Sequence, residues 1–147
     1  MTEVRDRRWI AATQRDVWKL LSVVEQYPAW SPWARRVEHA GGPAGLGVGY
    51  ATAAGEWRIV EFDPPRRQVH RAEHVPLRRS LDRLFELRSD GADGTWLELA
   101  VRYRPALGWL GQGLDRAVLR RAEARRLRRA LDGIERLAAG SGLRGVG

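Results

Sequence analysis

The chain has 147 residues, 26 of them Lys or Arg and 18 Asp or Glu, so its formal net charge is +8. Its 44% of hydrophobic residues supply a sizeable core for one domain, which excludes disordered and collagen-like classes. The absence of Cys excludes disulfides, thiolate metal sites and a Cys nucleophile. No apolar run approaches the roughly 20 residues of a membrane span, and residues 1–9 lack a signal-peptide core, so we expect a cytoplasmic protein.

The basic excess consists almost entirely of arginine. Lys19 is the only lysine among the 26 basic residues, so the other 25 are Arg. Two interpretations compete. A genome rich in G and C favours Arg codons without functional meaning, whereas an anionic partner would use the guanidinium group to bind phosphate or carboxylate.

The N-terminal third predicts a strand followed by two short helices. Residues 3–11 form the expected strand. Thr13, followed three residues later by Asp16, is typical of a helix N-cap, and the helix it opens has apolar residues on one side. Pro28 and Pro32 then leave room only for a short helical turn over 25–30.

The middle of the chain predicts short strands, and its end predicts one long helix. Short turns join the strands, so the sheet is expected to be antiparallel. The long helix is expected over 112–139, ended by Gly140-Ser141-Gly142, with 1–140 as one domain and 141–147 as a flexible tail. The strands are expected at 33–39, 48–53, 56–63, 69–75, 79–87 and 95–103.

This order of elements predicts an α+β fold of the helix-grip type. A curved antiparallel sheet of about 6–7 strands has one apolar face that must be covered, and only the C-terminal helix is long enough to cover it. Two short helices after the first strand would hold one end of that helix away from the sheet. An internal cavity is expected between them.

Several segments carry a resemblance to a known family. The sequence resembles the START-like, Bet v 1-like (SRPBCC) superfamily, and within it the bacterial polyketide cyclase/dehydrase and lipid-transport group. The resemblance implies the helix-grip fold and a hydrophobic ligand, but no shared catalytic set. The segments are TQRDVWKLL (13–21), YPAWSPW (27–33), GVG (47–49), WRIVEFDPPRR (57–67) and the Asp-Gly hairpin at 90–94.

Alternation along the last two strands predicts which side chains face inward. In 95–103 the inward set should be Leu97, Leu99, Val101 and Tyr103, which places a phenol in or beside the pocket. In 79–87, Arg83 falls on the same face as Phe85. Arg83 is then either a buried cation for a ligand carboxylate or enolate, or an arginine that extends to the rim in a different register.

The facing of 69–75 is ambiguous. His70 and His74 share one face of this strand. If that face points inward, the imidazoles become candidates for proton transfer together with Tyr103; if it points outward, they are ordinary surface residues. No metal site is expected, because the two histidines lack a third ligand nearby in sequence.

On the C-terminal helix, the apolar residues of the second half lie on one face, and the same face carries charged residues in the first half. Arg116 and Arg120 are either the polar end of the cavity or solvent-exposed residues beside a drifting apolar stripe. By size and by the family resemblance, Trp30, Trp33 and Trp57 are expected as apolar walls of the pocket, with core filling as the alternative.

These features favour a protein with a ligand pocket. Three functions are weighed: the first uses the pocket, the second uses the pocket or the Arg-rich C-terminal helix, and the third uses that helix. The first is binding of a polyketide-like or aromatic ligand, with cyclase or dehydrase chemistry if the site turns it over and an acidic acyl carrier protein as partner. The second is non-catalytic: either a lipid or ligand carrier, or a helper that docks on an anionic membrane surface or a partner through the Arg-rich C-terminal helix. Nucleic-acid binding ranks last, because no binding motif is present. No cofactor is expected, since phosphate-loop, nucleophile-elbow and zinc motifs do not occur.

Overall fold

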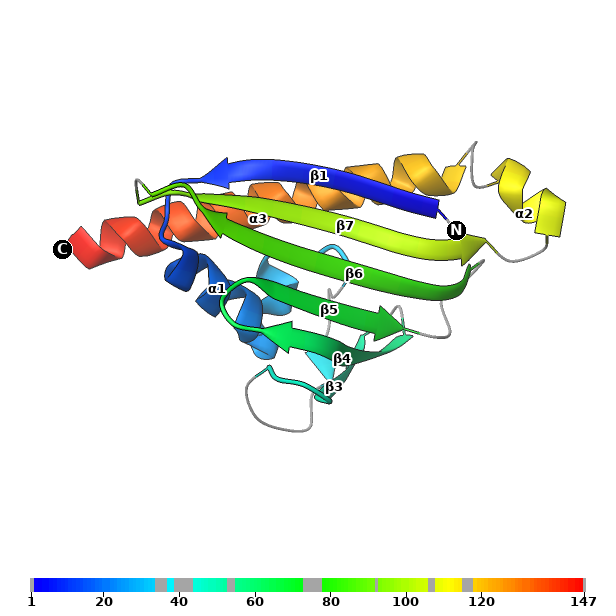
Figure 1. The fold of residues 1–147 in the computed structure, drawn as a ribbon, viewed down its shortest axis with the longest axis horizontal. Helices are drawn as coiled ribbons and strands as arrows, with labels where there is room; N and C mark the ends of the chain where they lie inside the picture. Colours follow the sequence, from blue (N-terminus) through cyan, green and yellow to red (C-terminus); the bar gives the residue numbers. More distant parts are fainter. Residues whose placement is uncertain are drawn as a thin grey trace.

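In a computed structural model, the described residues are 2–33, 37–38, 44–52, 55–72, 78–91, 93–105, 108–114 and 118–146. The chain folds into one sheet and a set of helices (Figure 1). In order, the elements are β1 (Thr2–Ile10), α1 (Gln14–Ser22), the 3-10 helix η1 (Val24–Ala29), β2 (Val37–Glu38), β3 (Gly49–Thr52), β4 (Gly55–Asp63), β5 (Arg67–Ala72), β6 (Arg78–Ser89), β7 (Thr95–Pro105), α2 (Gly108–Leu114) and α3 (Arg120–Val146).

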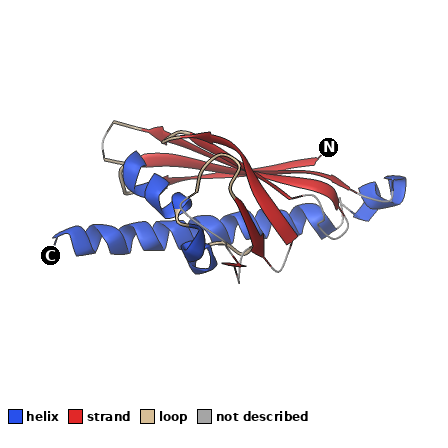
Figure 2. Cartoon of the chain, turned by 90° about the horizontal axis from the view of Figure 1, so that it is seen from below, coloured by secondary structure: helices blue, strands red, loops and turns tan. Residues whose placement is uncertain are grey.

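The seven strands form one antiparallel sheet in the order β1-β7-β6-β5-β4-β3-β2. Except for β1, which pairs with β7, each strand pairs with its neighbours in sequence, as short turns require. Figure 2 shows the helices on one side of this sheet, with α3 running along it. The predicted α+β helix-grip architecture is therefore confirmed.

The first helix begins where the sequence predicts. Thr13 is the N-cap of α1, and its hydroxyl accepts a hydrogen bond from the backbone N–H of Asp16 at 3.2 Å. This bond satisfies one of the free N–H groups of the first turn. The apolar face of α1, with Val17 and Leu21, is buried against the rest of the core.

Helix α3 covers the inner face of the sheet through a continuous apolar stripe. Gly133 lets it come close to the end of η1, because a Cβ at this position would lie 2.9 Å from the Cα of Trp30. The close approach fixes the distance between this part of the helix and the segment after η1. The buried residues of the stripe are Leu127, Ala130, Leu131, Ile134 and Ala138.

The boundaries of the C-terminal helix differ from the prediction. The expected helix over 112–139 is replaced by α2 and the separate helix α3, which continues past Gly140 to Val146. Gly140 and Gly142 each cost the helix only about 1 kcal/mol relative to alanine, and no proline follows to stop it. The predicted strand over 33–39 is described only at Val37–Glu38, and none of the described helices is both long and apolar enough to cross a membrane.

Candidate ligand-binding site

Arg83 lies in the interior of the protein, on the middle of β6. Its side chain faces α3 together with Leu81 and Phe85, and only 2% of the residue is exposed. The inward facing predicted from the alternation of β6 is therefore confirmed. A guanidinium group here is surrounded by the apolar core, where a charge needs partners.

The partners of Arg83 are hydroxyl groups and aromatic rings. Its NH1 donates to Ser31 Oγ at 3.2 Å, and its NH2 donates to the Tyr50 hydroxyl at 2.6 Å. The guanidinium carbon lies 4.0 Å from the ring centroid of Trp57 and 4.9 Å from that of Trp33, within the range of cation–π attraction.

Arg83 has no carboxylate partner among the residues that the structure describes. No Asp or Glu oxygen of those residues forms an ion pair with it within 4 Å. Its Nε is also buried without an acceptor. Because burying an ion costs several kcal/mol unless a counter-charge offsets it, this arrangement leaves a positive charge available inside the protein.

A chain of hydrogen bonds leads from Arg83 to α1. The Tyr50 hydroxyl lies 2.6 Å from Nδ1 of His70, and Nε2 of His70 lies 2.9 Å from Oε1 of Gln68. Gln68 Nε2 then donates to Ser22 Oγ at 3.4 Å, and Ser22 donates to the Trp18 carbonyl at 2.8 Å.

The direction of these bonds fixes the protonation of His70. Arg83 can only donate to the Tyr50 oxygen, so the Tyr50 O–H is free to donate to Nδ1 of His70. His70 then carries its proton on Nε2 and donates it to the carbonyl of Gln68. This assignment of the tautomer comes from the hydrogen-bond network.

Tyr50 and His70, the two middle groups of this chain of hydrogen bonds, both have pKa values shifted so that their neutral forms are favoured. Burial, reinforced by the charge of Arg83, lowers the pKa of His70 well below its ordinary value. Burial raises the pKa of Tyr50 to about 12, although the charge and the hydrogen bond of Arg83 offset part of this effect. At neutral pH, Arg83 is thus the only charge in this chain of groups.

A second unsatisfied donor lies over the same strand. Trp30 Nε1 is buried without a hydrogen-bond partner. The Trp30 ring packs edge-on against Phe85, with 6.0 Å between ring centroids, and Phe85 is two residues from Arg83 on the inner face of β6. Two buried donors without acceptors therefore lie near one segment of the sheet.

Glu123 of α3 is also buried, at 0% exposure. Its Oε2 accepts a hydrogen bond from Trp33 Nε1 at 3.1 Å, and its Oε1 accepts one from the half-exposed Arg126 at 2.6 Å. The Trp33 indole thus touches Arg83 with its ring and binds Glu123 with its N–H. The ring separates the two opposite charges and ties α3 to the polar site.

The structure brings together only part of the predicted set. His70 and Arg83 are direct neighbours in the pairing of β5 with β6, and Trp33 and Trp57 cover the guanidinium. Leu97, Leu99, Val101 and Tyr103 are buried as their alternation predicts. Tyr103 pairs with Leu81 in the register, beyond Arg83 along the sheet, so it lies outside the chain of hydrogen bonds.

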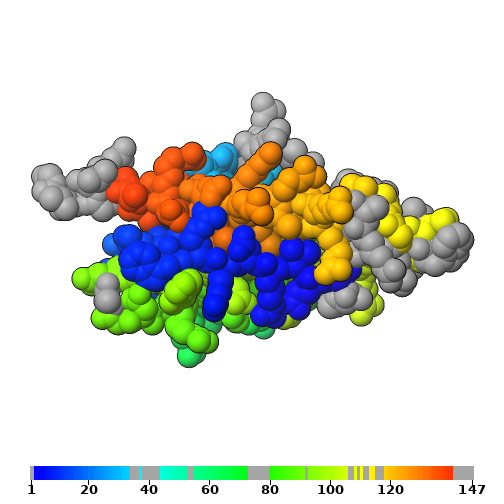
Figure 3. Space-filling view, turned by 90° about the horizontal axis from the view of Figure 1, so that it is seen from above, coloured from blue at the N-terminus to red at the C-terminus, as the bar shows by residue number. Residues whose placement is uncertain are grey.

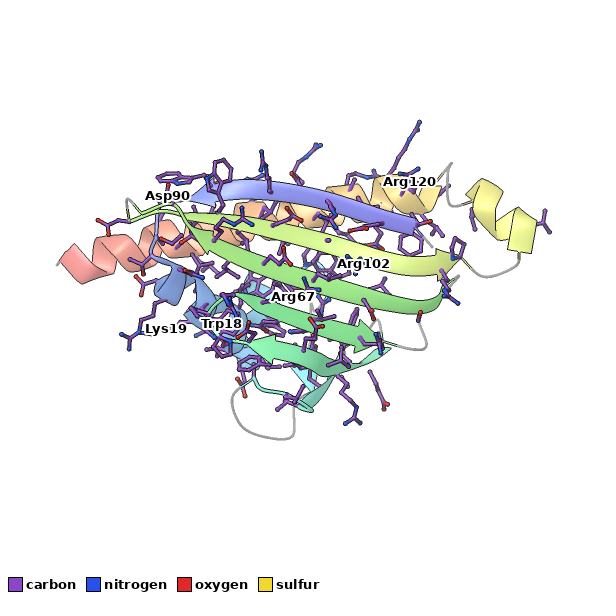
Figure 4. All side chains as sticks on the ribbon, in the orientation of Figure 1. Trp18, Lys19, Arg67, Asp90, Arg102 and Arg120 are labelled. Atoms are coloured by element: carbon purple, nitrogen blue, oxygen red, sulfur yellow. The ribbon has the colours of Figure 1, made fainter. Side chains whose placement is uncertain are left out.

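Two expectations need correction. His70 is 1% exposed, so the alternative of an ordinary surface histidine is wrong for it. Arg120 is exposed at the first residue of α3 and points away from the sheet (Figure 4), so it does not form a polar end of a cavity. At the N-terminal end of α3, Leu119 and Glu123 occupy the inward positions. His74 and Arg116 lie outside the described residues.

Sequence reasoning assigned no role to five residues of the polar site, namely Tyr50, Gln68, Ser22, Ser31 and Glu123. Gln68 precedes His70 by two residues and so shares its face of β5, which is the signal that could have found it. Tyr50 pairs with Trp57 across β3 and β4, and its facing depends on that register. The two serines, Ser22 and Ser31, carry no signal of their own.

Two other features of the described residues bear on the type of site. Within the described ranges, no group of three or more His, Cys, Asp or Glu residues is arranged to hold a metal ion. On the outer face of the sheet, a groove of about 730 Å³ includes Arg67 and Trp96 in its lining. Figure 4 views this face, and Arg67 there pairs with Glu61 at 2.7 Å and with Glu86, which is typical of solvated surface charges.

The fold and this interior define a helix-grip protein of the START and Bet v 1 type. The chain belongs to the family described as polyketide cyclase/dehydrase and lipid transport, whose model matches residues 1–139. No curated protein matches its sequence.

Solved structures show the same fold at low sequence identity. A START superfamily protein from Mycobacterium smegmatis has a TM-score of 0.73 and 12% identity, covering 94% of this chain and 97% of that chain. The ZhuI aromatase/cyclase from Streptomyces sp. R1128 has a TM-score of 0.68 and 21% identity, covering 92% of this chain and 94% of that chain. Norcoclaurine synthase from Thalictrum flavum, a point mutant with a transition-state analogue, has 0.72 and 14%, covering 96% of both.

Proposed function

We propose that this protein binds a small hydrophobic ligand between the sheet and α3, and that Arg83 holds an anionic or enolate oxygen of that ligand. The observation that carries the proposal is a buried guanidinium group whose Nε lacks an acceptor and which has no carboxylate partner among the residues that the structure describes. A ligand oxygen would supply the missing negative charge and accept the free N–H of Arg83. Such charge-assisted hydrogen bonds are about twice as strong as neutral ones.

The surroundings of Arg83 favour a flat, apolar ligand body. Trp30, Trp33, Trp57 and Phe85 surround the inner face of β6 with aromatic rings. Aromatic walls with a few polar groups are typical of small-molecule sites. The family description and the likeness to an aromatase/cyclase support a polyketide-like or aromatic compound in an internal cavity. The cytoplasmic location of the protein stays a prediction.

A second candidate function is proton transfer on the bound ligand. It is favoured by the Tyr50–His70 pair, because Tyr50 can accept a proton while passing its own to Nδ1 of His70. The positive charge that forms on His70 would lie near Arg83, so the step requires the ligand anion to offset it. A cyclase or dehydrase would use such a pair, and an acyl carrier protein remains a predicted donor of its substrate.

Two fluorescent probes test the binding proposal. Anilinonaphthalene sulfonate is an aromatic anion, and phenylnaphthylamine is a neutral compound with the same rings. Since a hydrogen bond to a charged group contributes about 1.5–3 kcal/mol, Arg83→Met should weaken binding of the anion at least about tenfold and leave the neutral probe within about threefold. Equal loss of both probes, or of neither, would contradict the role of Arg83.

The matched control is Arg88→Met, an exposed arginine on the outer face of the same strand. It makes the same chemical change without touching the interior, so both probes should bind as they do to the unmodified protein. Native mass spectrometry of protein purified from its own host would then identify the natural ligand. With that ligand, Tyr50→Phe should retain binding and abolish turnover if the protein is an enzyme; turnover unchanged by this substitution would exclude proton transfer through Tyr50.

A further inference from the structure

The first half of α3 presents a row of arginines to solvent. Four of its arginines are exposed and fall within an arc of about 100° on the helix, at 100° per residue. We call them the basic stripe: Arg121, Arg125, Arg128 and Arg129. The buried residues of α3 lie on the opposite side, so the stripe faces away from the sheet. Figure 3 shows this surface of α3 running along the molecule beside β1.

The basic stripe has no counter-charge among the described residues. Within the described ranges, none of its four arginines takes part in an ion pair. The acid within this half of the helix, Glu123, faces the interior instead. Asp132 and Glu135, at the C-terminal end of the stripe, both pair with Arg8 of β1, which offsets part of their charge. The outward surface of α3 is therefore positive along its first half.

Exposed apolar side chains lie at the N-terminal end of the stripe. Val118 is 48% exposed just before α3, and Leu110 of α2 is 58% exposed. Figure 1 shows α2 beyond the edge of the sheet, at the same end of the molecule as the start of α3. Single exposed apolar residues are common. Here Val118 directly precedes the helix that carries the basic stripe, and α2 with Leu110 lies at the same end of the molecule, which gives this end an amphipathic character.

We propose that the basic stripe docks the protein on an anionic lipid membrane, with Leu110 and Val118 entering the interface. Basic residues beside exposed apolar ones are what interfacial binding requires, because the charges attract anionic headgroups and the apolar groups enter the acyl boundary. A single-stranded nucleic acid would favour aromatic residues for stacking, and α3 contains none; a duplex would use the arginines but leave the apolar end unexplained. An acidic protein would match the charges but leave the apolar end unexplained.

The proposal stands independently of the ligand in the interior. The stripe and Arg83 lie on opposite sides of the layer formed by α3, and docking on empty vesicles needs no bound ligand. A hydrophobic ligand would nevertheless partition into lipid, so docking would bring the protein to where such a ligand accumulates. Failure of vesicle binding would leave the proposed role of Arg83 untouched.

Vesicle flotation tests the docking. The full chain is mixed with vesicles of phosphatidylcholine alone or with about one third phosphatidylglycerol. We expect binding only to the anionic vesicles. Each basic residue near an anionic surface contributes about 1 kcal/mol, or about fivefold in affinity, so replacing all four stripe arginines by Gln should weaken binding by at least about a hundredfold.

The matched control replaces four exposed arginines outside the stripe: Arg15→Gln, Arg58→Gln, Arg88→Gln and Arg104→Gln. It has the same net charge as the stripe variant, and we expect its binding to stay within about tenfold of the unmodified protein. Equal loss in both variants would show that net charge alone matters and would overturn the proposal. No binding of the unmodified protein to anionic vesicles would overturn it too.

The apolar end separates a membrane from other anionic partners. Salt screens the arginines, so Leu110→Ser with Val118→Ser should reduce the binding that remains at raised salt several-fold. Unchanged binding of this double variant at raised salt would overturn the lipid assignment. Stripe-dependent binding to duplex DNA at physiological salt, without vesicle binding, would overturn it in favour of a nucleic acid.

Discussion

Acidification should destabilise the protein through His70. Because burial and the charge of Arg83 lower the pKa of His70 in the folded state, the folded protein keeps this imidazole neutral. The unfolded chain binds a proton there near pH 6.5. Below that pH the unfolded state therefore holds more protons than the folded state, and the free energy of unfolding falls as the pH falls.

The size of the effect follows from proton linkage. One histidine that is neutral when folded and has a pKa of about 6.5 when unfolded costs about 1.4 kcal/mol per pH unit below that value. Between pH 7.5 and pH 5 the loss amounts to about 2 kcal/mol from this residue alone. In the folded state, protonation would convert Nδ1 into a donor facing the Tyr50 hydroxyl, which already accepts a hydrogen bond from the positively charged Arg83.

Urea unfolding of the protein and of His70→Gln across this pH range measures the difference. The variant lacks the titrating group, so its free energy of unfolding should fall less by about 2 kcal/mol. Other histidines and carboxylates titrate in both proteins and cancel in the comparison. Parallel curves for the two proteins, or an NMR titration that places His70 near pH 6.5, would refute the reasoning.

Three further substitutions test the packing and the buried charges by the free energy of unfolding. Arg83→Met should leave it unchanged or raise it by up to about 3 kcal/mol, because an uncompensated charge is removed; a loss of 3–5 kcal/mol would indicate a hidden ion pair. Gly133→Ala should cost about 1–3 kcal/mol, since the new Cβ would lie 2.9 Å from backbone, whereas Gly140→Ala meets nothing and should be neutral or stabilising. Trp33→Phe should cost about 1–3 kcal/mol because Glu123 loses a donor; no change would show that the bond is dispensable.

The fold could be predicted from the sequence because its apolar residues follow the periods of strands and helices. Alternation placed Leu97, Leu99 and Val101 on the inner face, and the N-cap at Thr13 placed the start of α1. The same rule found Arg83, because Phe85 and other apolar neighbours two residues away fixed the facing of β6.

The polar half of the site could not be predicted in the same way. On β5 the inward face carries Gln68 and His70, so its pattern looks like that of an outward face. The facing of Tyr50 depends on how β3 pairs with β4, and a register shift between Ile59 and Glu61 interrupts the pairing of β4 with β5. Glu123 places a charged residue on the buried face of α3, and its buried donor, Trp33, comes from a distant segment. Such departures from pattern are expected at functional sites.

Replacing arginine by lysine at one position tests whether that position requires the guanidinium group or only a positive charge. A bias of the genome puts Arg where any cation would serve, whereas a binding role can require the guanidinium itself. Arg83 lies with its flat group over Trp57 and Trp33 and donates from two nitrogens, which a lysine cannot reproduce. Arg83→Lys should therefore weaken binding of the anionic probe about as much as Arg83→Met does.

The basic stripe should behave in the opposite way. A membrane surface attracts charge through long-range electrostatics, so replacing all four stripe arginines by Lys should leave vesicle binding within about threefold. Vesicle flotation of this stripe variant, compared with probe binding to Arg83→Lys, distinguishes arginines that need only their charge from an arginine that needs its guanidinium group. If Lys fails at the stripe as well, the stripe recognises a phosphate through bidentate hydrogen bonds instead of a diffuse negative surface. If Arg83→Lys binds the anionic probe as well as the unmodified protein does, the interior site requires only a positive charge, and the aromatic rings around it only exclude water.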